Sequence, residues 1–156
     1  MNFEAIQHIP MSQQAHGINP NHVVFRLRAG RDDLKHCTLF YADRACRLTP
    51  VIFSSVEMQV EAQDEWFDYF QVILESPYKR ICYYFELDDG TQKLLYYGDF
   101  FTDHRVDDRS EYYQLPFNHP ADIAAPPVWA QDAVVYNIFP DSFATSRRFI
   151  SGKSSE

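Results

Sequence analysis

Short runs in which apolar and polar side chains alternate dominate the first hundred positions of the chain. Such runs lie at residues 23–28, 36–41 and 57–63, and in the first of them Val23, Phe25 and Leu27 occupy every second position. A period of two places successive side chains on opposite faces of a strand, which is typical of half-buried antiparallel strands. No longer stretch keeps a helical period. The chain is therefore predicted to be all-β.

Two further segments, residues 66–75 and 80–87, are apolar at nearly every position and are predicted to be central strands covered on both faces. The sequence Asp88-Asp89-Gly90-Thr91 then supplies an Asp-Gly pair, which favours the positive φ angles of a hairpin turn. Residues 81–87 should therefore pair antiparallel with residues 92–97. Several short strands separated by turn residues predict an immunoglobulin-like antiparallel β-sandwich.

Beyond Tyr97 the chain becomes polar, with one last edge strand expected around Tyr112 and Tyr113. Four of the nine prolines then fall between Pro116 and Pro127, and proline stiffens a chain and cannot donate to a sheet. We predict a sandwich over residues 1–119 and a linker over residues 120–132.

The last segment, residues 133–156, is expected to open another domain. Val134–Phe139 is apolar on both faces, as in a strand of a covered parallel sheet. A parallel strand needs a crossover of a dozen or more residues and then a partner strand, and this chain supplies neither. The segment is therefore interpreted as the first strand of a truncated domain.

Charge and composition exclude several classes of partner. The net charge is −8, whereas nucleic acids and anionic membranes attract basic patches. No apolar run approaches the ~20 residues that cross a bilayer, and the first residues lack the features of a secretory signal. Cys37, Cys46 and Cys82 form an odd set that fits a reducing compartment better than a disulfide framework. The sequence thus predicts a cytoplasmic protein that binds neither nucleic acid nor membrane.

The acidic residues do not form a plausible catalytic or metal site. The adjacent pairs Asp64/Glu65, Asp88/Asp89 and Asp107/Asp108 look like solvated turn residues, and the histidines lack ligand spacing. Asp103 and His104, even together with Asp107 and Asp108, offer too few oxygens for Ca²⁺, which takes six or more. Motifs for a nucleophile elbow, a phosphate loop or a zinc protease are absent from the sequence. We expect no catalytic residue, metal or cofactor.

The end of the chain carries a resemblance to a known family. Tyr136, Ile138, Phe139, Pro140, Phe143 and Ala144 resemble the opening of the catalytic barrel in the α-amylase superfamily, glycoside hydrolase family 13. The preceding residues resemble the N-terminal module of its cyclomaltodextrinase, neopullulanase and maltogenic amylase subgroup. The matching blocks are residues 3–8, 66–70, 77–85 and 116–119, the last leading to 127–130. The resemblance spans nearly the full chain.

This resemblance implies a noncatalytic module similar to carbohydrate-binding module family 34. Such a module binds maltodextrin or cyclodextrin, or drives homodimerisation, beside its own (β/α)8 catalytic domain. The whole enzyme would cleave α-1,4 and sometimes α-1,6 glucosidic bonds with carboxylates on barrel segments that lie outside this chain. Tyr136 and Asp141 would line the barrel mouth. The alternative is an immunoglobulin-like structural or interaction domain without sugar affinity.

Two departures from the family pattern affect the expected sites. Arg147 and Arg148 stand where many members have a calcium-binding loop, and two arginines would repel a cation. The residues 45–47 replace an aromatic residue that reaches the partner's active site in the family dimer, so this role would move to Phe40 or Tyr41.

Trp66 and Tyr69 are the other candidate sugar contacts. A glucose ring stacks on an exposed aromatic ring that has polar neighbours, and Asp64, Glu65 and Asp68 supply that polarity. Because the two rings point to opposite faces of an ideal strand, only one of them should belong to a single site. The candidate carbohydrate-binding residues are therefore Trp66, Tyr69 and Tyr41.

Overall fold

The structure is a computed structural model that describes residues 1–98, 100–123 and 126–138. The chain divides into two units, Met1–Ala124 and Ala125–Glu156, and each is described by itself. The strands of the first unit are β1 (Ala15–Asn19), β2 (His22–Gly30), β3 (His36–Asp43), β4 (Ser54–Glu57), β5 (Gln59–Gln63), β6 (Phe67–Glu75), β7 (Ile81–Asp88), β8 (Lys93–Tyr97), β9 (Phe100–Thr102) and β10 (Tyr113–Leu115). A 3-10 helix follows at Pro120–Asp122.

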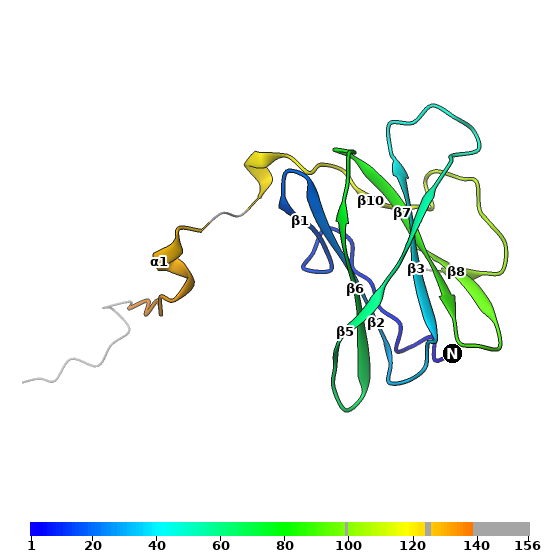
Figure 1. Ribbon diagram of the computed structural model, residues 1–156, viewed down its shortest axis with the longest axis horizontal. Helices are drawn as coiled ribbons and strands as arrows, with labels where there is room; N and C mark the ends of the chain where they lie inside the picture. Colours follow the sequence, from blue (N-terminus) through cyan, green and yellow to red (C-terminus); the bar gives the residue numbers. More distant parts are fainter. Residues whose placement is uncertain (99, 124–125, 139–156) are drawn as a thin grey trace, which may run out of the picture. The chain divides into compact units, whose positions relative to one another are not determined.

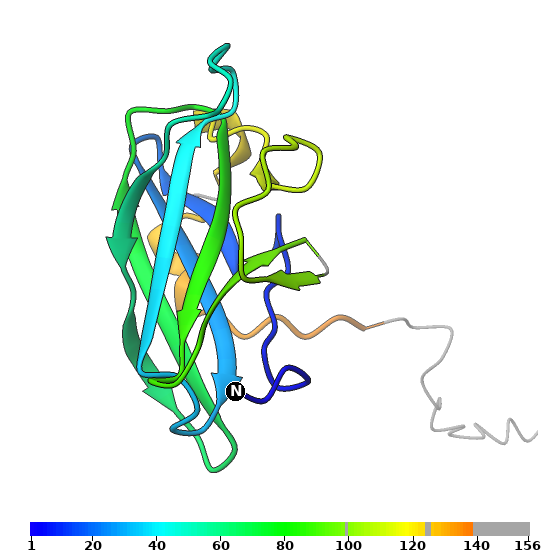
Figure 2. The same cartoon turned by 90° about the vertical axis from the view of Figure 1, so that its right-hand side faces the viewer.

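These strands form two antiparallel sheets packed face to face (Figures 1 and 2). The first sheet has the order β1-β2-β6-β5, and the second has the order β4-β3-β7-β8-β9, with β10 pairing with β7. The inward side chains of both sheets meet in one core, in which Phe25, Leu39 and Phe85 are fully buried. The predicted immunoglobulin-like β-sandwich is confirmed.

The hairpin between β7 and β8 agrees with the Asp-Gly signal. Asp88 pairs with Lys93, and Asp89–Gln92 forms the loop. Gly90 has a φ of 85°, which an L side chain rarely adopts. The Oδ1 atom of Asp89 accepts hydrogen bonds from the backbone N–H groups of Thr91 (2.8 Å) and Gln92 (2.9 Å). The pairing was correctly predicted, but the carboxylate of Asp89 organises a wider loop than a two-residue turn.

Replacing Gly90 with Val should lower the free energy of unfolding by about 1 kcal/mol or more, because a β-branched residue resists a positive φ. A Cβ atom at this position would also lie 3.2 Å from Cγ of Lys35. Urea denaturation followed by circular dichroism measures the change. Gly90→Asn is the matched control, and it should cost less because Asn tolerates the left-handed region. Equal stability of Gly90→Val and the wild type would contradict the prediction.

The two segments predicted to be covered on both faces differ in the structure. In β7, Ile81–Leu87 is buried on both faces except for half-buried Glu86. In β6 burial alternates, and Ile73 is 54% exposed. The prediction is therefore confirmed for β7 and wrong for β6, which is central in its sheet but lies open on its outer face.

The outer face of the second sheet is covered by a second cluster of side chains. Tyr84 and Tyr97 stack with ring centroids 4.6 Å apart, and Phe53 packs edge-on against Tyr84 and Tyr112. Phe53 and Tyr112 come from the loops that follow β3 and β9. Arg105 lies over the Phe53 ring at 5.4 Å. These loops make β7 a fully buried strand, whereas no described loop covers the outer face of β6 in this way.

The alternating run at residues 57–63 also departs from its prediction as one half-buried strand. It divides at Met58, so that β4 pairs with β3 in one sheet and β5 pairs with β6 in the other. Met58 itself is buried, and its backbone N–H donates to the Cys37 carbonyl at 2.8 Å. Every residue of β5 is exposed, because β5 is an edge strand with a register shift between Val60 and Ala62.

The described part of the second unit contains one short helix, α1 (Val128–Gln131). Residues 133–138 have no regular secondary structure, and Val134 is 95% exposed. The strand expected over Val134–Phe139 is therefore not formed in its described part, and the assignment of this segment to a barrel stays a prediction. Phe139 and the following residues lie outside the described part.

Candidate functional site

Trp66 lies in the loop between β5 and β6, at the end of the sandwich where Met1 is found (Figure 1). Oδ1 of Asp64 accepts hydrogen bonds from the backbone N–H groups of Trp66 (2.8 Å) and Phe67 (2.7 Å). The Trp66 carbonyl accepts one from the N–H of Arg31 at 2.9 Å. The backbone is thus fixed on both sides, while the indole side chain is free: the residue is 69% exposed.

The Trp66 ring borders a cavity of about 450 Å³. Its lining combines two aromatic residues with charged and amide side chains: Asn2, Ala5, Gly30, Arg31, Asp33, Glu65, Trp66 and Phe67. The Phe67 ring is held by the Arg28 guanidinium, 4.2 Å from the ring centroid. An exposed ring beside hydrogen-bonding groups is the combination that a sugar requires.

Tyr69 is half-buried on the outer face of β6, and its hydroxyl donates to Oδ2 of Asp64 at 2.7 Å. This hydrogen bond is the main reason why the pKa of Asp64 lies below its ordinary value. Tyr69 lines a separate cavity of about 250 Å³ with Arg26, Glu61, Ala62, Phe70 and Gln71. Trp66 and Tyr69 are therefore linked through Asp64 but border different cavities.

Tyr41 lies far from both of these residues. It is half-buried near the end of β3, where it pairs with Tyr83 and Ser54 and packs against the core. The loop after β3 and the loop between β5 and β6 project from opposite ends of the sandwich (Figures 1 and 2). The structure thus does not combine Tyr41 with Trp66 in one site. Phe40, the other replacement considered, stacks on Tyr84 at 4.9 Å.

The barrel-mouth residues belong to the second unit. Tyr136 is 74% exposed, and Asp141 lies outside the described residues. Their expected role stays a prediction.

The acidic pairs singled out in the sequence lie in turns and loops, except for Asp88, which ends strand β7. The Asp89 carboxylate accepts hydrogen bonds from Thr91, Gln92 and the Met1 ammonium. These hydrogen bonds hold the pKa of Asp89 well below its ordinary value, and the one from the Thr91 hydroxyl has the largest effect. Asp108 caps Ser110 through both its N–H and its hydroxyl. In the described ranges, no three His, Cys, Asp or Glu side chains are grouped so that they could hold a metal ion.

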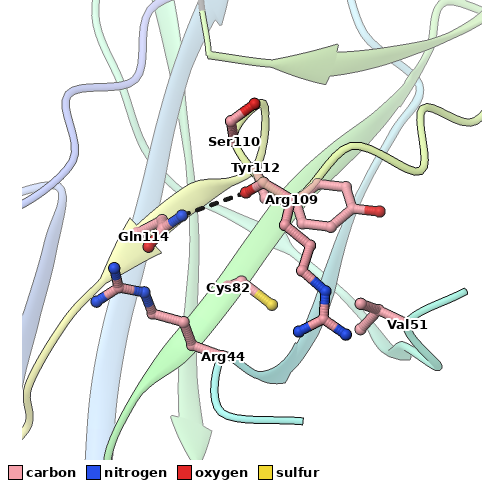
Figure 3. A pocket seen from close by; sticks show the side chains of 7 residues that line it. All are labelled: Arg44, Val51, Cys82, Arg109, Ser110, Tyr112 and Gln114. Carbon is pink, nitrogen blue, oxygen red and sulfur yellow. Dashed lines mark hydrogen bonds between the residues drawn. The ribbon is translucent and has the colours of Figure 1, made fainter. Parts of the chain in front are cut away.

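Sequence reasoning missed a cavity of about 280 Å³ on the outer face of the second sheet (Figure 3). It is lined by Arg44, Val51, Cys82, Arg109, Ser110, Tyr112 and Gln114. These residues are up to 70 positions apart, so no local motif could have revealed the cavity.

Comparisons with known proteins agree with the fold. The cyclomaltodextrinase of a Bacillus species is 34% identical over 146 residues, which cover 92% of this chain and 25% of that protein. Neopullulanase 2 of Thermoactinomyces vulgaris is 32% identical over 145 residues, covering 92% of this chain and 24% of that protein. A solved cyclomaltodextrinase structure superposes with a TM-score of 0.76 at 29% identity, covering 87% of this chain and 23% of that one.

The chain therefore spans about a quarter of the length of these relatives. Among the described residues, no helix has the length and apolar character needed to cross a membrane. Residues 1–119 match the family described as "Alpha amylase, N-terminal ig-like domain". With this match over most of the chain, the protein belongs to the family of N-terminal immunoglobulin-like domains of alpha amylases.

Proposed function

We propose that the chain is a noncatalytic module that binds α-glucan, as maltodextrin or cyclodextrin, for an enzyme that hydrolyses α-1,4 and in some cases α-1,6 glucosidic bonds. The observation that carries the proposal is Trp66, a residue that is 69% exposed on a fixed backbone and lines a partly polar cavity. The names of the relatives, neopullulanase and cyclomaltodextrinase, support this class of substrate. The catalytic carboxylates would belong to the barrel that follows this module.

Within the cavity, Trp66 would provide the stacking surface and its neighbours would provide hydrogen bonds. A pyranose has an apolar C–H face and a rim of hydroxyl groups, so it needs both. Asp33 and Glu65 would accept hydrogen bonds from hydroxyl groups, and Arg31 and Asn2 would donate them. Tyr69 would extend the surface along the outer face of β6 only for a ligand long enough to pass Asp64.

Trp66→Ala should weaken binding of β-cyclodextrin and maltoheptaose at least about tenfold, since an exposed aromatic anchor contributes much of the affinity at such surfaces. Isothermal titration calorimetry measures the change. The fold should stay intact because the side chain lies mostly in solvent. Trp129→Ala is the matched control, because Trp129 is 74% exposed in the other unit. Unchanged affinity of Trp66→Ala would move the site elsewhere, and loss of folding would assign Trp66 a structural role.

The alternative is a dimerising or spacer domain without sugar affinity. It is favoured by the exposed apolar side chains of the first sheet, where Ile18, Val60 and Ile73 are 44%, 43% and 54% exposed. Exposed apolar side chains on a sheet can form a protein contact. If neither sugar binds while sedimentation velocity detects a dimer, this alternative replaces the binding function. Homodimerisation of the whole enzyme is compatible with both.

A cytoplasmic location belongs to the same proposal. Cys37, Cys46 and Cys82 are all free thiols, and burial raises the pKa of Cys82 to about 11. Reduced and unreactive thiols fit a reducing compartment.

A further inference from the structure

The cavity bordered by Arg44 and Arg109 concentrates positive charge on an acidic protein. The chain has a net charge of −8, yet none of the residues that line this cavity is acidic. Figure 3 shows the two arginine side chains on either side of Cys82, which lies on the cavity floor. Arg44, which lines the cavity, begins the loop after β3. This loop and the β5–β6 loop that contains Trp66 lie at opposite ends of the sandwich (Figures 1 and 2).

Neither arginine has a carboxylate partner in the described part of the chain. The Arg109 guanidinium donates to the backbone carbonyls of Cys46 and Leu48, which position it but leave its charge uncompensated. Arg44 is exposed, and only its backbone N–H has a described hydrogen bond, to the Arg80 carbonyl at 3.0 Å. A guanidinium group keeps several N–H donors for a ligand after one or two are used.

The carboxylates of Asp108 and Asp43, which are close in sequence to Arg109 and Arg44, accept hydrogen bonds from their own loops. Oδ1 of Asp108 accepts hydrogen bonds from the N–H (2.9 Å) and the hydroxyl (2.7 Å) of Ser110. Oδ1 of Asp43 accepts one from the N–H of Ala45 at 2.8 Å. Burial is the main cause of the raised pKa of Cys82, and the charge of the nearby Arg109 acts in the opposite direction.

We propose that this cavity binds a small oxyanion of the phosphate class, with Arg44 and Arg109 as its cationic donors. Planar guanidinium groups match the oxygens of phosphate and form short, charge-assisted hydrogen bonds with them. The volume of about 280 Å³ exceeds what a bare phosphate needs, since one water occupies about 30 Å³. A phosphate monoester of a small molecule would fill the cavity better than inorganic phosphate.

The test is calorimetric titration of the chain with inorganic phosphate, glucose 6-phosphate and glucose at constant ionic strength. Arg44→Gln should weaken binding of both phosphates about tenfold or more, as expected for losing hydrogen bonds to a charged group. Arg44→Lys should retain part of the affinity, because it keeps the charge but not the planar fork. Arg47→Gln is the matched control: Arg47 is exposed on the same loop and does not line the cavity.

Each outcome decides the proposal. Tighter binding of glucose 6-phosphate than of phosphate identifies a monoester site, and equal affinities identify an inorganic phosphate site. Phosphate binding that survives Arg44→Gln, or that falls equally in Arg47→Gln, overturns the proposal, as does an absence of binding. Trp66 does not line this cavity, so the phosphate site does not depend on the proposed sugar site. Trp66→Ala should therefore leave the phosphate affinity unchanged.

Discussion

Lowering the pH from 7 to 4.5 is expected to cost the folded chain about 2–3 kcal/mol of stability through His8 alone. His8 is buried, only 6% exposed, between the Arg26 carbonyl, 2.7 Å from Nδ1, and the Tyr83 hydroxyl, 2.9 Å from Nε2. The carbonyl requires a proton on Nδ1, so in neutral His8 the hydroxyl donates to Nε2. Burial lowers the pKa of His8 from 6.5 to about 4, against the smaller opposing effect of the Arg26 carbonyl.

The direction of the pH effect on stability depends on whether the folded or the unfolded chain binds the proton. Below pH 6.5 the unfolded chain protonates His8 while the folded chain does not, until the pH reaches about 4. The stabilising contribution is therefore complete above pH 6.5 and is lost as the pH falls toward 4.

Urea denaturation at pH 7 and pH 4.5 should show this loss in the wild type and a correspondingly smaller loss in His8→Gln, which cannot titrate. Tyr83→Phe serves as the control, because it removes the hydroxyl donor but leaves the ring buried. It should keep most of the pH dependence, since burial is the main cause of the shift. An identical loss in the wild type and His8→Gln would show that other groups cause the acid sensitivity.

Gly17→Ala should lower the free energy of unfolding by about 2 kcal/mol, the usual range for overpacking a closed site. A Cβ atom on Gly17 would lie 1.9 Å from Oδ1 of Asn118. Asn118 cannot easily move away, because it is only 2% exposed and its Nδ2 donates to the carbonyls of Asn19 (3.2 Å) and Pro20 (3.3 Å). Thermal and urea unfolding of the single variant measure the loss.

A double-mutant cycle separates this clash from a general effect of the methyl group. Asn118→Ala alone should cost about 1 kcal/mol, and adding it to Gly17→Ala should restore part of the loss. Gly30→Ala is the matched control, since a Cβ there would meet nothing closer than 3.5 Å. Additive losses in the double variant would refute the proposed contact.

The sequence predicted the local features of the fold well. Gly90 and Asp89 signal the β7–β8 hairpin within four residues, and β7 is apolar on both faces because both are covered. β6 has a similar composition but an open outer face, since covering depends on which loops fold over it. The division of the alternating run 57–63 at Met58 and the contact of Gly17 with Asn118 are set by tertiary packing, which periodicity does not record.

The candidate site was predicted only in part. Trp66 is a candidate because it stands beside acidic residues at the start of a predicted strand. The structure places it in the loop before β6, where it is exposed. Its association with Asn2 and Asp33 could not be predicted, because the N-terminal segment reaches this end through long-range contacts such as the hydrogen bond from the Asn2 N–H to Asp33 Oδ2 at 2.6 Å. The grouping of Arg44 with Arg109 was missed for the same reason.

The division of residues 54–63 between the two sheets limits how this domain can change in length. Because β4 and β5 are joined through the single buried residue Met58, one inserted or deleted residue would change the register of an edge strand in one or both sheets. A shift of one residue turns every side chain of a strand to its other face. Related proteins should therefore keep the spacing between β4 and β5 nearly constant.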